Sequence, residues 1–196
     1  TCGAAASLVI SLKAIVEDAS DEVILVAPFF PEYTVFVQNA GAKSVILRPN
    51  GAFQISLDAM EQAITPKTRA VIINSPNNPS GVVYSAETYE KLAAFSNENR
   101  GKFGHPIYLI SDEPYREIIY DGLPILYVPK FYRDTIIAFV QQIPQPSGER
   151  IGYILVPDCV TAAKEVYTAV CGAGRFMGFV CAPHLFQDVI LKCMGQ

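Results

Sequence analysis

Positive charge is scarce in this chain of 196 residues. Lysine and arginine together number 15 against 19 aspartates and glutamates, which gives a formal net charge of -4. Proteins that bind nucleic acid or an anionic membrane surface through bulk charge carry an excess of basic residues. Neither nucleic acid nor a membrane is therefore an expected partner of this chain.

Long apolar runs and a basic leader are also missing. Hydrophobic residues make up 51% of the chain, yet no apolar run reaches the roughly 18 residues that a membrane span needs. The first residues, TCGAAASLVISLKAIVED, show neither the basic start nor the cleavage pattern of a secretion signal. Both absences favour a cytoplasmic location.

The cysteines lack the spacings typical of metal sites. The five are Cys2, Cys159, Cys171, Cys181 and Cys193. No two of them form a C-x-x-C pair, and none stands at ligand spacing from a histidine. An odd, scattered set in an apolar chain is typical of reduced thiols that pack as small apolar residues. We expect no metal site, and reduced cysteines also agree with the cytoplasm.

What the sequence does contain is an alternation of short apolar runs and helical stretches. The apolar runs are 22–27, 44–48, 70–75, 107–112, 135–140 and 151–156. The predicted helices are 4–18, 31–40, 56–64 and 85–99, and residues 159–195 read as mostly helical with breaks around CGAGR and at Pro183. Near-continuous apolar strands lie in sheets covered on both faces. The alternation therefore predicts a doubly wound, parallel α/β sheet.

Ligands of such sheets collect at the carboxyl ends of the strands. Four segments follow strand ends in this chain: 28–33, 75–81, 111–115 and 141–150. The chain start, TCGAAAS, reads as a Gly-Ala turn that opens a helix. Free amides at a helix start favour an anion such as phosphate.

Taken together, TCGAAASL, SPNNPSG, SDEPY and GERIGY resemble, in this order, the large domain of pyridoxal-phosphate-dependent aminotransferases of classes I and II. The resemblance extends from Thr1 to about Gln187. It implies a three-layer fold with about six strands, in which 151–156 is an antiparallel edge strand and helices cover both faces. It also implies that residues 1–196 form a single large domain, without the family's N-terminal segment and C-terminal small domain.

The resemblance further implies a cofactor site. Asn78 and Tyr115 match two hydrogen-bond donors to the cofactor's phenolic oxygen, and Phe30 matches the aromatic residue that stacks on its ring. Asp112 matches the carboxylate beneath the pyridine nitrogen, where a buried anion keeps that nitrogen protonated. Gly3, Ala4 and Ala5 match the phosphate-binding turn, and Arg150 matches the arginine that binds the phosphate in a bidentate pair. Taken singly, these are also ordinary turn, core and surface residues.

The Ser-x-x-Lys loop of the family has no counterpart here. Counting back from Arg150, the Schiff-base lysine falls on Gln142 and the phosphate-binding serine on Phe139. A carboxamide is neither a nucleophile nor a useful base near neutral pH. We therefore expect no transaminase activity, and at most weak, non-covalent binding of pyridoxal phosphate. No catalytic residue of the inherited reaction is predicted.

The altered residues cluster around one pocket in this interpretation. They are the loop 141–147, Phe176 in GRFMG and His184 in APHLF, where the resemblance suggests smaller residues at the last two positions. From the sequence, we interpret the chain as an excised and deliberately re-engineered large domain.

Two alternatives stay open. The pocket could be a new esterase-like site, with His184 as base, Cys2 or Cys181 as nucleophile and Gln141 or Gln142 as oxyanion donor. His105 precedes its strand and is expected at the far end of the sheet. The chain could instead be a self-association module, forming a homodimer through uncovered edges and the apolar side chains of Phe139, Ile143, Phe176 and Phe179.

Overall fold

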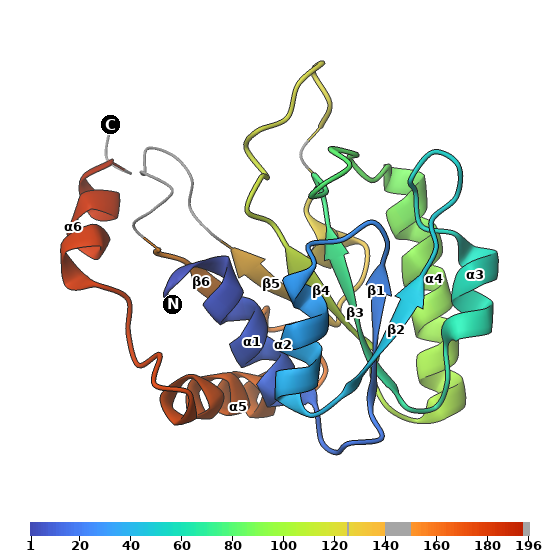
Figure 1. Ribbon diagram of the computed structural model, residues 1–196, viewed down its shortest axis with the longest axis horizontal. Helices are drawn as coiled ribbons and strands as arrows, with labels where there is room; N and C mark the ends of the chain where they lie inside the picture. Colours follow the sequence, from blue (N-terminus) through green and yellow to red (C-terminus); the bar gives the residue numbers. More distant parts are fainter. Residues whose placement is uncertain (125, 140–149, 194–196) are drawn as a thin grey trace.

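A six-stranded sheet forms the centre of the molecule (Figure 1). The computed structural model describes residues 1–124, 126–139 and 150–193. The strands are β1 (Glu22–Val26), β2 (Lys43–Leu47), β3 (Thr68–Asn74), β4 (Tyr108–Asp112), β5 (Thr135–Phe139) and β6 (Tyr153–Leu155). Their order across the sheet is β2-β1-β3-β4-β5-β6. All neighbours are parallel except β5 and β6, which pair antiparallel. The predicted fold class, with its antiparallel edge strand, is confirmed.

Helices cover both faces of this sheet (Figure 1). The helices are α1 (Gly3–Ile15), α2 (Glu32–Ala40), α3 (Leu57–Ala63), α4 (Ala86–Phe103), α5 (Ala163–Phe176) and α6 (His184–Cys193). The first five cover the sheet, and α6 lies to one side of it (Figure 1). In β1, Val23 and Leu25 belong to the core on the side of α1, α2 and α5. Ile24 and Val26 belong to the core on the side of α3 and α4. Because successive side chains of a strand point to opposite faces, two apolar cores require the continuous apolar runs seen in the sequence.

Local signals fix where several helices begin and end. The side chain of Ser85 accepts a hydrogen bond from the amide of Thr88 at the start of α4, and Ser56 does the same for Ala59 at the start of α3. At the other ends, Gly41 and Gly104 take the left-handed conformation that terminates α2 and α4. Each serine is the first residue of a helix range predicted from the sequence, 56–64 and 85–99, and each is an N-cap in the structure.

The predicted helix break at CGAGR is wrong. Helix α5 runs without interruption through these residues to Phe176. A glycine inside a helix costs only about 1 kcal/mol, and α5 packs a buried apolar face, including Val166 and Val170, onto α1. Gly174 lies close to Ile10 and to the carbonyl oxygen of Phe179, so a small residue suits this contact. The interruption falls instead at 177–183.

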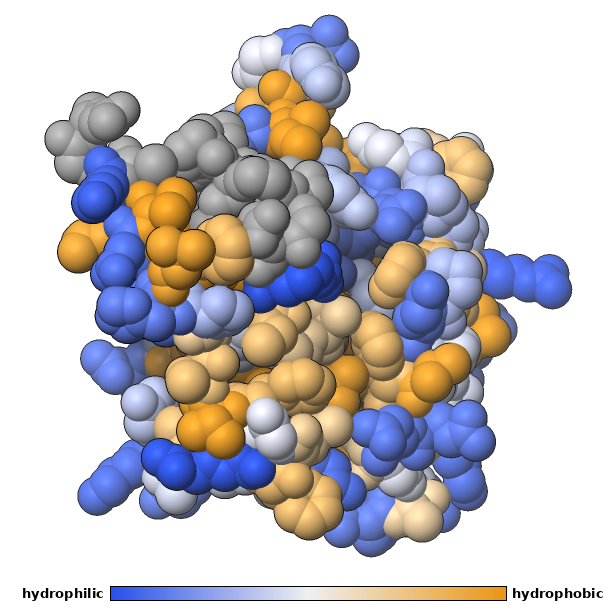
Figure 2. Space-filling model, turned by 60° about the vertical axis from the view of Figure 1, so that its left-hand side comes forward, coloured by the Kyte–Doolittle hydropathy of each residue, from blue (hydrophilic) through white to orange (hydrophobic). Residues whose placement is uncertain are grey.

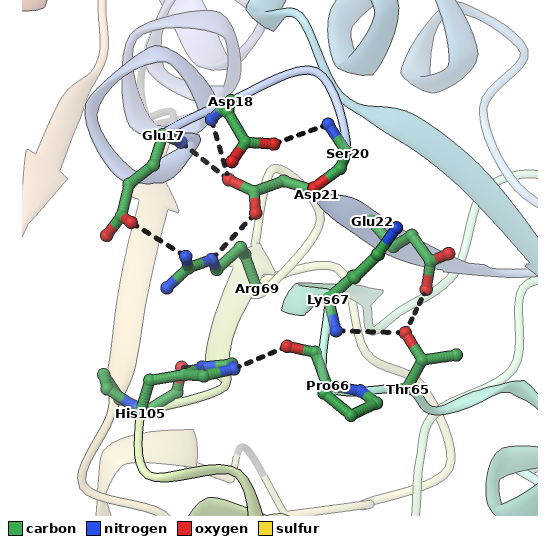
Figure 3. Close-up of polar contacts among 11 residues, drawn as sticks. Glu17, Asp18, Ser20, Asp21, Glu22, Thr65, Pro66, Lys67, Arg69 and His105 are labelled. Atoms are coloured by element: carbon green, nitrogen blue, oxygen red, sulfur yellow. Dashed lines mark hydrogen bonds and ion pairs between the residues drawn. The ribbon is translucent and has the colours of Figure 1, made fainter.

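A network of polar contacts lies at the end of the sheet opposite the carboxyl ends of the parallel strands (Figure 3). Arg69 donates to Asp21 at 2.9 Å and pairs with Glu17 at 2.8 Å. Asp21 also accepts hydrogen bonds from the amides of Glu17 and Asp18. The ring nitrogens of His105 lie near the carbonyl oxygens of Pro66 and Pro106. His105 therefore lies at the far end of the sheet, as predicted.

Two kinds of feature are missing from the described part of the chain. No helix there combines the length and the apolar character needed to cross a bilayer. No group of three or more histidine, cysteine, aspartate or glutamate side chains is placed to hold a metal ion. Cys2, Cys159, Cys171 and Cys181 are free thiols.

Candidate functional site

The start of α1 and the residue before β6 come together at one end of the candidate site. The amino group of Thr1 donates to the carbonyl oxygen of Gly152 at 2.7 Å, and the amide of Gly152 donates to the carbonyl oxygen of Thr1 at 3.0 Å. This pairing sets the guanidinium of Arg150 against Gly3. A Cβ atom added to Gly3 would lie 2.7 Å from Nη2 of Arg150, so a larger residue there would displace the guanidinium.

This end of the site is suited to an anion. The first turn of α1 has no side-chain cap, because its N-cap residue Cys2 accepts no hydrogen bond. The amides of Gly3, Ala4 and Ala5 are therefore helix-start donors without a side-chain acceptor. The positive end of the helix dipole and the Arg150 guanidinium both favour a phosphate at this position.

Asp112 supplies the opposite charge at the end of β4. Its side chain is almost completely buried, and its Oδ2 accepts a hydrogen bond from the hydroxyl of Tyr33. Its Oδ1 is buried without a hydrogen-bond partner among the described residues. Burial raises the pKa of Asp112 to about 7; the charge of Glu113 adds to this, and the hydrogen bond from Tyr33 opposes it. An unpartnered carboxylate oxygen in such surroundings fits a cationic N–H group.

A buried asparagine joins two loops of the site. Asn74, the last residue of β3, donates from Nδ2 to the carbonyl oxygen of Asp112 at 2.9 Å. Its Oδ1 accepts from the amide of Asn78 at 2.6 Å. The main chain at Asn78 is thereby fixed relative to the end of β4. The side chain of Asn78 is half-buried.

Aromatic residues flank the carboxylate. The rings of Phe30 and Tyr33 meet edge to face with centroids 5.8 Å apart, and Phe29 stacks on Tyr33 at 6.2 Å. Tyr115 is half-buried, and its hydroxyl contributes to the raised pKa of Tyr33, which burial and Asp112 raise more strongly. Tyr33 therefore stays protonated and donates its hydrogen to Asp112.

The donor set fits one kind of ligand. An anion-binding turn stands at one end, and at the other is a buried carboxylate whose Oδ1 has no partner among the described residues. Aromatic rings lie beside this carboxylate. A flat aromatic molecule with a phosphate group and a basic ring nitrogen matches these three features. Pyridoxal phosphate has all three.

Comparison with known proteins agrees with this site. The model of the family "Aminotransferase class I and II" matches residues 1–194. The chain belongs to this family. Class I and II aminotransferases depend on pyridoxal phosphate, so the family and the donor set point to the same ligand.

Individual class I and II aminotransferases share substantial identity with the chain. An amino transferase from Eubacterium rectale is 52% identical, with a TM-score of 0.95, and the match covers 100% of this chain and 50% of that structure. A probable aspartate aminotransferase from Methanocaldococcus jannaschii is 34% identical over 95% of this chain and 48% of its own length. An aromatic-amino-acid aminotransferase 2 from Thermococcus litoralis is 31% identical over 87% and 44%, respectively. The chain thus spans about half the length of these aminotransferases.

The structure brings most of the predicted cofactor residues to the side of the sheet where the parallel strands have their carboxyl ends. Gly3 and Arg150 are in contact, and Asn78 is tied to Asp112 through Asn74. Gln142 and the rest of the loop 141–147 lie outside the described residues, as does the side chain of Phe139. The roles assigned to these residues remain predictions.

Among the described residues, no contact supports the alternative esterase-like site; its proposed oxyanion donors Gln141 and Gln142 lie outside them. His184 is 88% exposed and faces Asp188 of its own helix at 3.4 Å. No hydrogen bond within the described residues joins His184 to Cys2 or Cys181. Cys181 is exposed, and Cys2 is half-buried at the start of α1.

Two residues of the site were missed from the sequence. Tyr33 lies in the first turn of α2 and Asn74 at the end of β3. Each has a signal in the sequence: Tyr33 follows Phe30 by three residues, one helical turn, and Asn74 is a polar residue that ends an apolar strand. Neither signal alone separates a site residue from an ordinary core or turn residue.

Proposed function

We propose that this chain is a cofactor-binding half of an aminotransferase-family protein, and that it holds pyridoxal phosphate without a covalent bond. The observation that carries this proposal is the Oδ1 atom of Asp112, which is buried and has no hydrogen-bond partner among the described residues. The contact of Arg150 with Gly3 supports a phosphate site beside it. A buried carboxylate oxygen without a hydrogen-bond partner is costly, and a protonated ring nitrogen would supply a partner for Oδ1.

Each group has a separate task. Arg150 and the amides at the start of α1 bind the phosphate, and Asp112 keeps the ring nitrogen protonated. Tyr33 fixes the orientation of the Asp112 carboxylate through its hydroxyl. Asn78 and Tyr115 donate to the phenolic oxygen, and Phe30 excludes water from one side of the ring. When bound, the cofactor supplies an electron sink for amino-acid chemistry.

Transamination by this chain is not expected, because Gln142 stands where the lysine of the family would stand. An amide nitrogen cannot form the covalent link, and it cannot carry a substrate proton. Titration of the purified chain with pyridoxal phosphate, followed by absorbance, tests the binding. Asp112→Asn is expected to weaken binding about tenfold or more, as loss of a charge-assisted pair does.

Borohydride reduction of the complex, followed by mass spectrometry, tests the absence of a covalent link. We expect the mass of the unmodified chain. An adduct at any lysine of the pocket would overturn the non-covalent part of the proposal. Absence of binding, with the chain folded by circular dichroism, would overturn the whole.

The residues of the altered loop suggest an origin other than re-engineering. Phenylalanine is encoded by UUY and valine by GUN, where Y is U or C and N is any base. Three bases read from the second base of the Phe139 codon into the Val140 codon are therefore UYG, which encodes leucine (UUG) or serine (UCG). Glutamine is encoded by CAR, where R is A or G, and every isoleucine codon begins with A. The same one-base shift at Gln142 and Ile143 therefore gives ARA, which encodes lysine (AAA) or arginine (AGA). A one-base offset, closed by a second change before Gly148, thus allows both residues of a Ser-x-x-Lys loop at the family spacing. Deliberate replacement predicts no such relation.

The coding DNA decides between these origins. We infer that the shifted frame of the gene reads serine and lysine at these two places, so that restoring the frame gives a chain able to attach the cofactor. A gene whose codons give leucine or arginine there would leave re-engineering as the better account. The non-covalent proposal applies to the chain with Gln142 in either case.

We also propose that the chain self-associates, with a second copy as its partner. The support is an apolar face over α5, α6 and β6 (Figure 2). Exposed apolar side chains there include those of Tyr153, Leu155, Phe176, Val180, Leu185 and Leu191.

A cytoplasmic location remains a proposal, supported by the free thiols of the described cysteines.

A further inference from the structure

Glu113 is a buried carboxylate directly beside the candidate site. It follows Asp112 at the end of β4, and its side chain is only 4% exposed. Ser111 and Glu113 alternate with Asp112, so they face the opposite side of the sheet from the Asp112 carboxylate. A buried carboxylate is costly unless its oxygens are paired.

Both oxygens of Glu113 are paired. Oε1 accepts from the hydroxyl of Ser111 at 2.8 Å, and Oε2 forms an ion pair with Nη1 of Arg116 at 2.7 Å. The Arg116 guanidinium also lies over the ring of Tyr127, 5.7 Å from its centroid. The amide of Glu113 donates to the carbonyl oxygen of Ala138 at 3.0 Å, which extends the pairing of β4 with β5.

The ion pair closes a short turn around Tyr115. Glu113 and Arg116 are three residues apart, and Tyr115 lies between them. Beyond the pair, the carbonyl oxygen of Tyr115 accepts from the amide of Ile118 at 2.9 Å. The main chain that carries the Tyr115 ring is therefore held on both sides.

The same ion pair borders the loop that carries Asn78. A cavity of about 10 Å³, large enough for roughly one water molecule, is lined by Ser75, Glu113 and Arg116 among others. Ser75 opens the turn that leads to Asn78, and its hydroxyl accepts from the amide of Tyr84 at 2.9 Å. Glu113 and Arg116 thus lie between the turns that carry the two proposed donors to the phenolic oxygen.

We propose that Glu113 is a positioning residue, which through Arg116 holds the turns of Tyr115 and Asn78 at the separation needed for both to bind the phenolic oxygen of pyridoxal phosphate. This inference rests on the proposed function. It assigns Glu113 no contact with the cofactor, because the carboxylate faces the other side of the sheet.

A double-mutant cycle tests the proposal. Glu113→Gln, Tyr115→Phe and the double variant are titrated with pyridoxal phosphate, and the pH dependence of the bound cofactor's absorbance is recorded. We expect Glu113→Gln to weaken binding about tenfold and to raise the apparent pKa of the phenolic oxygen, since a misplaced donor no longer stabilises the phenolate. In the Tyr115→Phe background, Glu113→Gln is expected to add much less than its effect alone.

Matched controls separate positioning from general stability. Glu117→Gln removes an exposed carboxylate from the same turn and is expected to change neither affinity nor spectrum. Ser111→Ala removes one bond to Glu113 and serves if Glu113→Gln does not fold. Arg116→Lys keeps the charge and is expected to restore part of the affinity that Arg116→Gln loses.

The outcomes distinguish this inference from the proposed function. Binding by the unmodified chain, with Glu113→Gln equal to Glu117→Gln, would overturn the positioning role alone. Fully additive effects of Glu113→Gln and Tyr115→Phe would do the same. No binding by the folded, unmodified chain would overturn the proposed function, and this inference with it.

Discussion

The carboxyl group of Asp112 is almost completely buried, and this burial makes the residue sensitive to pH. In the folded chain, burial raises the pKa of Asp112 from its ordinary value of 3.8 to about 7. Between these values the folded state binds more protons than the unfolded state. The contribution of Asp112 to stability therefore falls as pH rises from about 4 to about 7, and is constant above.

Asp112→Asn is expected to remove this dependence. Urea unfolding without cofactor, at a series of pH values, measures the free energy of unfolding of both chains. As pH rises from about 4 to about 7, the free energy of unfolding of the variant should increase relative to that of the parent chain. The gain is limited to a few kcal/mol, at about 1.4 kcal/mol per pKa unit. A stability difference that is the same at all these pH values would contradict the raised pKa.

Alanine at Gly3 tests the contact with Arg150, and Gly41, which follows α2, supplies a matched control. Both take a positive φ, of 80° and 100°, so alanine strains each backbone by about 1–2 kcal/mol. Only at Gly3 does the added Cβ meet Arg150; at Gly41 it meets nothing within 4 Å. We expect Gly3→Ala to weaken cofactor binding about tenfold, by displacing a charge-assisted phosphate contact, and Gly41→Ala to leave it unchanged. Equal affinities in a fluorescence titration would remove Arg150 from the phosphate site.

At this scale the sequence predicted residue types better than partners. Arg150 and Gly3 stand far apart in the chain, and contacts such as the pairing of Thr1 with Gly152 and the hydrogen bond from Ser7 to the carbonyl oxygen of Tyr153 bring them together. Tyr33 escaped prediction because its role depends on which face of α2 meets the end of β4. A hydrogen bond between distant elements leaves no local pattern in a sequence.

Among the elements, the loop between α1 and β1 depends on Arg69 of β3 (Figure 3). Burial acts to raise the pKa of Asp21, but the backbone amides and Arg69 outweigh it and lower the pKa below its ordinary value. The stabilisation from Asp21 is thus present above its unfolded pKa and is lost as pH falls through the folded pKa.

Arg69→Gln is expected to destabilise the chain by about 1–3 kcal/mol, since it leaves a buried carboxylate with fewer donors. Chemical unfolding at neutral pH measures the loss. Lys67→Gln is the control, because Lys67 is exposed, and its effect should stay within about 0.5 kcal/mol. The cost of Arg69→Gln should shrink in acid, where Asp21 is protonated. A cost that is independent of pH would place the contribution of Arg69 elsewhere.

Strands were predicted more faithfully than helix ends in this chain. A strand buried on both faces leaves a continuous apolar run, and all six runs are strands in the structure. Helix α5 was mispredicted because glycine is read as a break, while packing against α1 outweighs the local cost. Local propensity decides an element only where tertiary contacts do not.

On the scale of the whole molecule, the two edges of the sheet are unlike. The outer strand β2 is parallel to its neighbour, and β6 is a short antiparallel strand beside the apolar face (Figure 2). An uncovered edge strand offers unpaired backbone groups to another chain. Leu155 on β6 is 38% exposed and Ile46 on β2 is 59% exposed, so both edges carry an accessible apolar side chain.

If a second copy binds through β6 and the neighbouring apolar face, a charge on that edge opposes association, whereas the same charge on β2 does not. We expect the parent chain to sediment with a weight-average mass that rises with concentration. Leu155→Lys should weaken self-association about tenfold or more, because it buries an unpaired ammonium group in the contact. Ile46→Lys should sediment like the parent. A parent chain that stays monomeric at all concentrations would remove the proposed partner, and a stronger effect of Ile46→Lys would move the contact to the other edge.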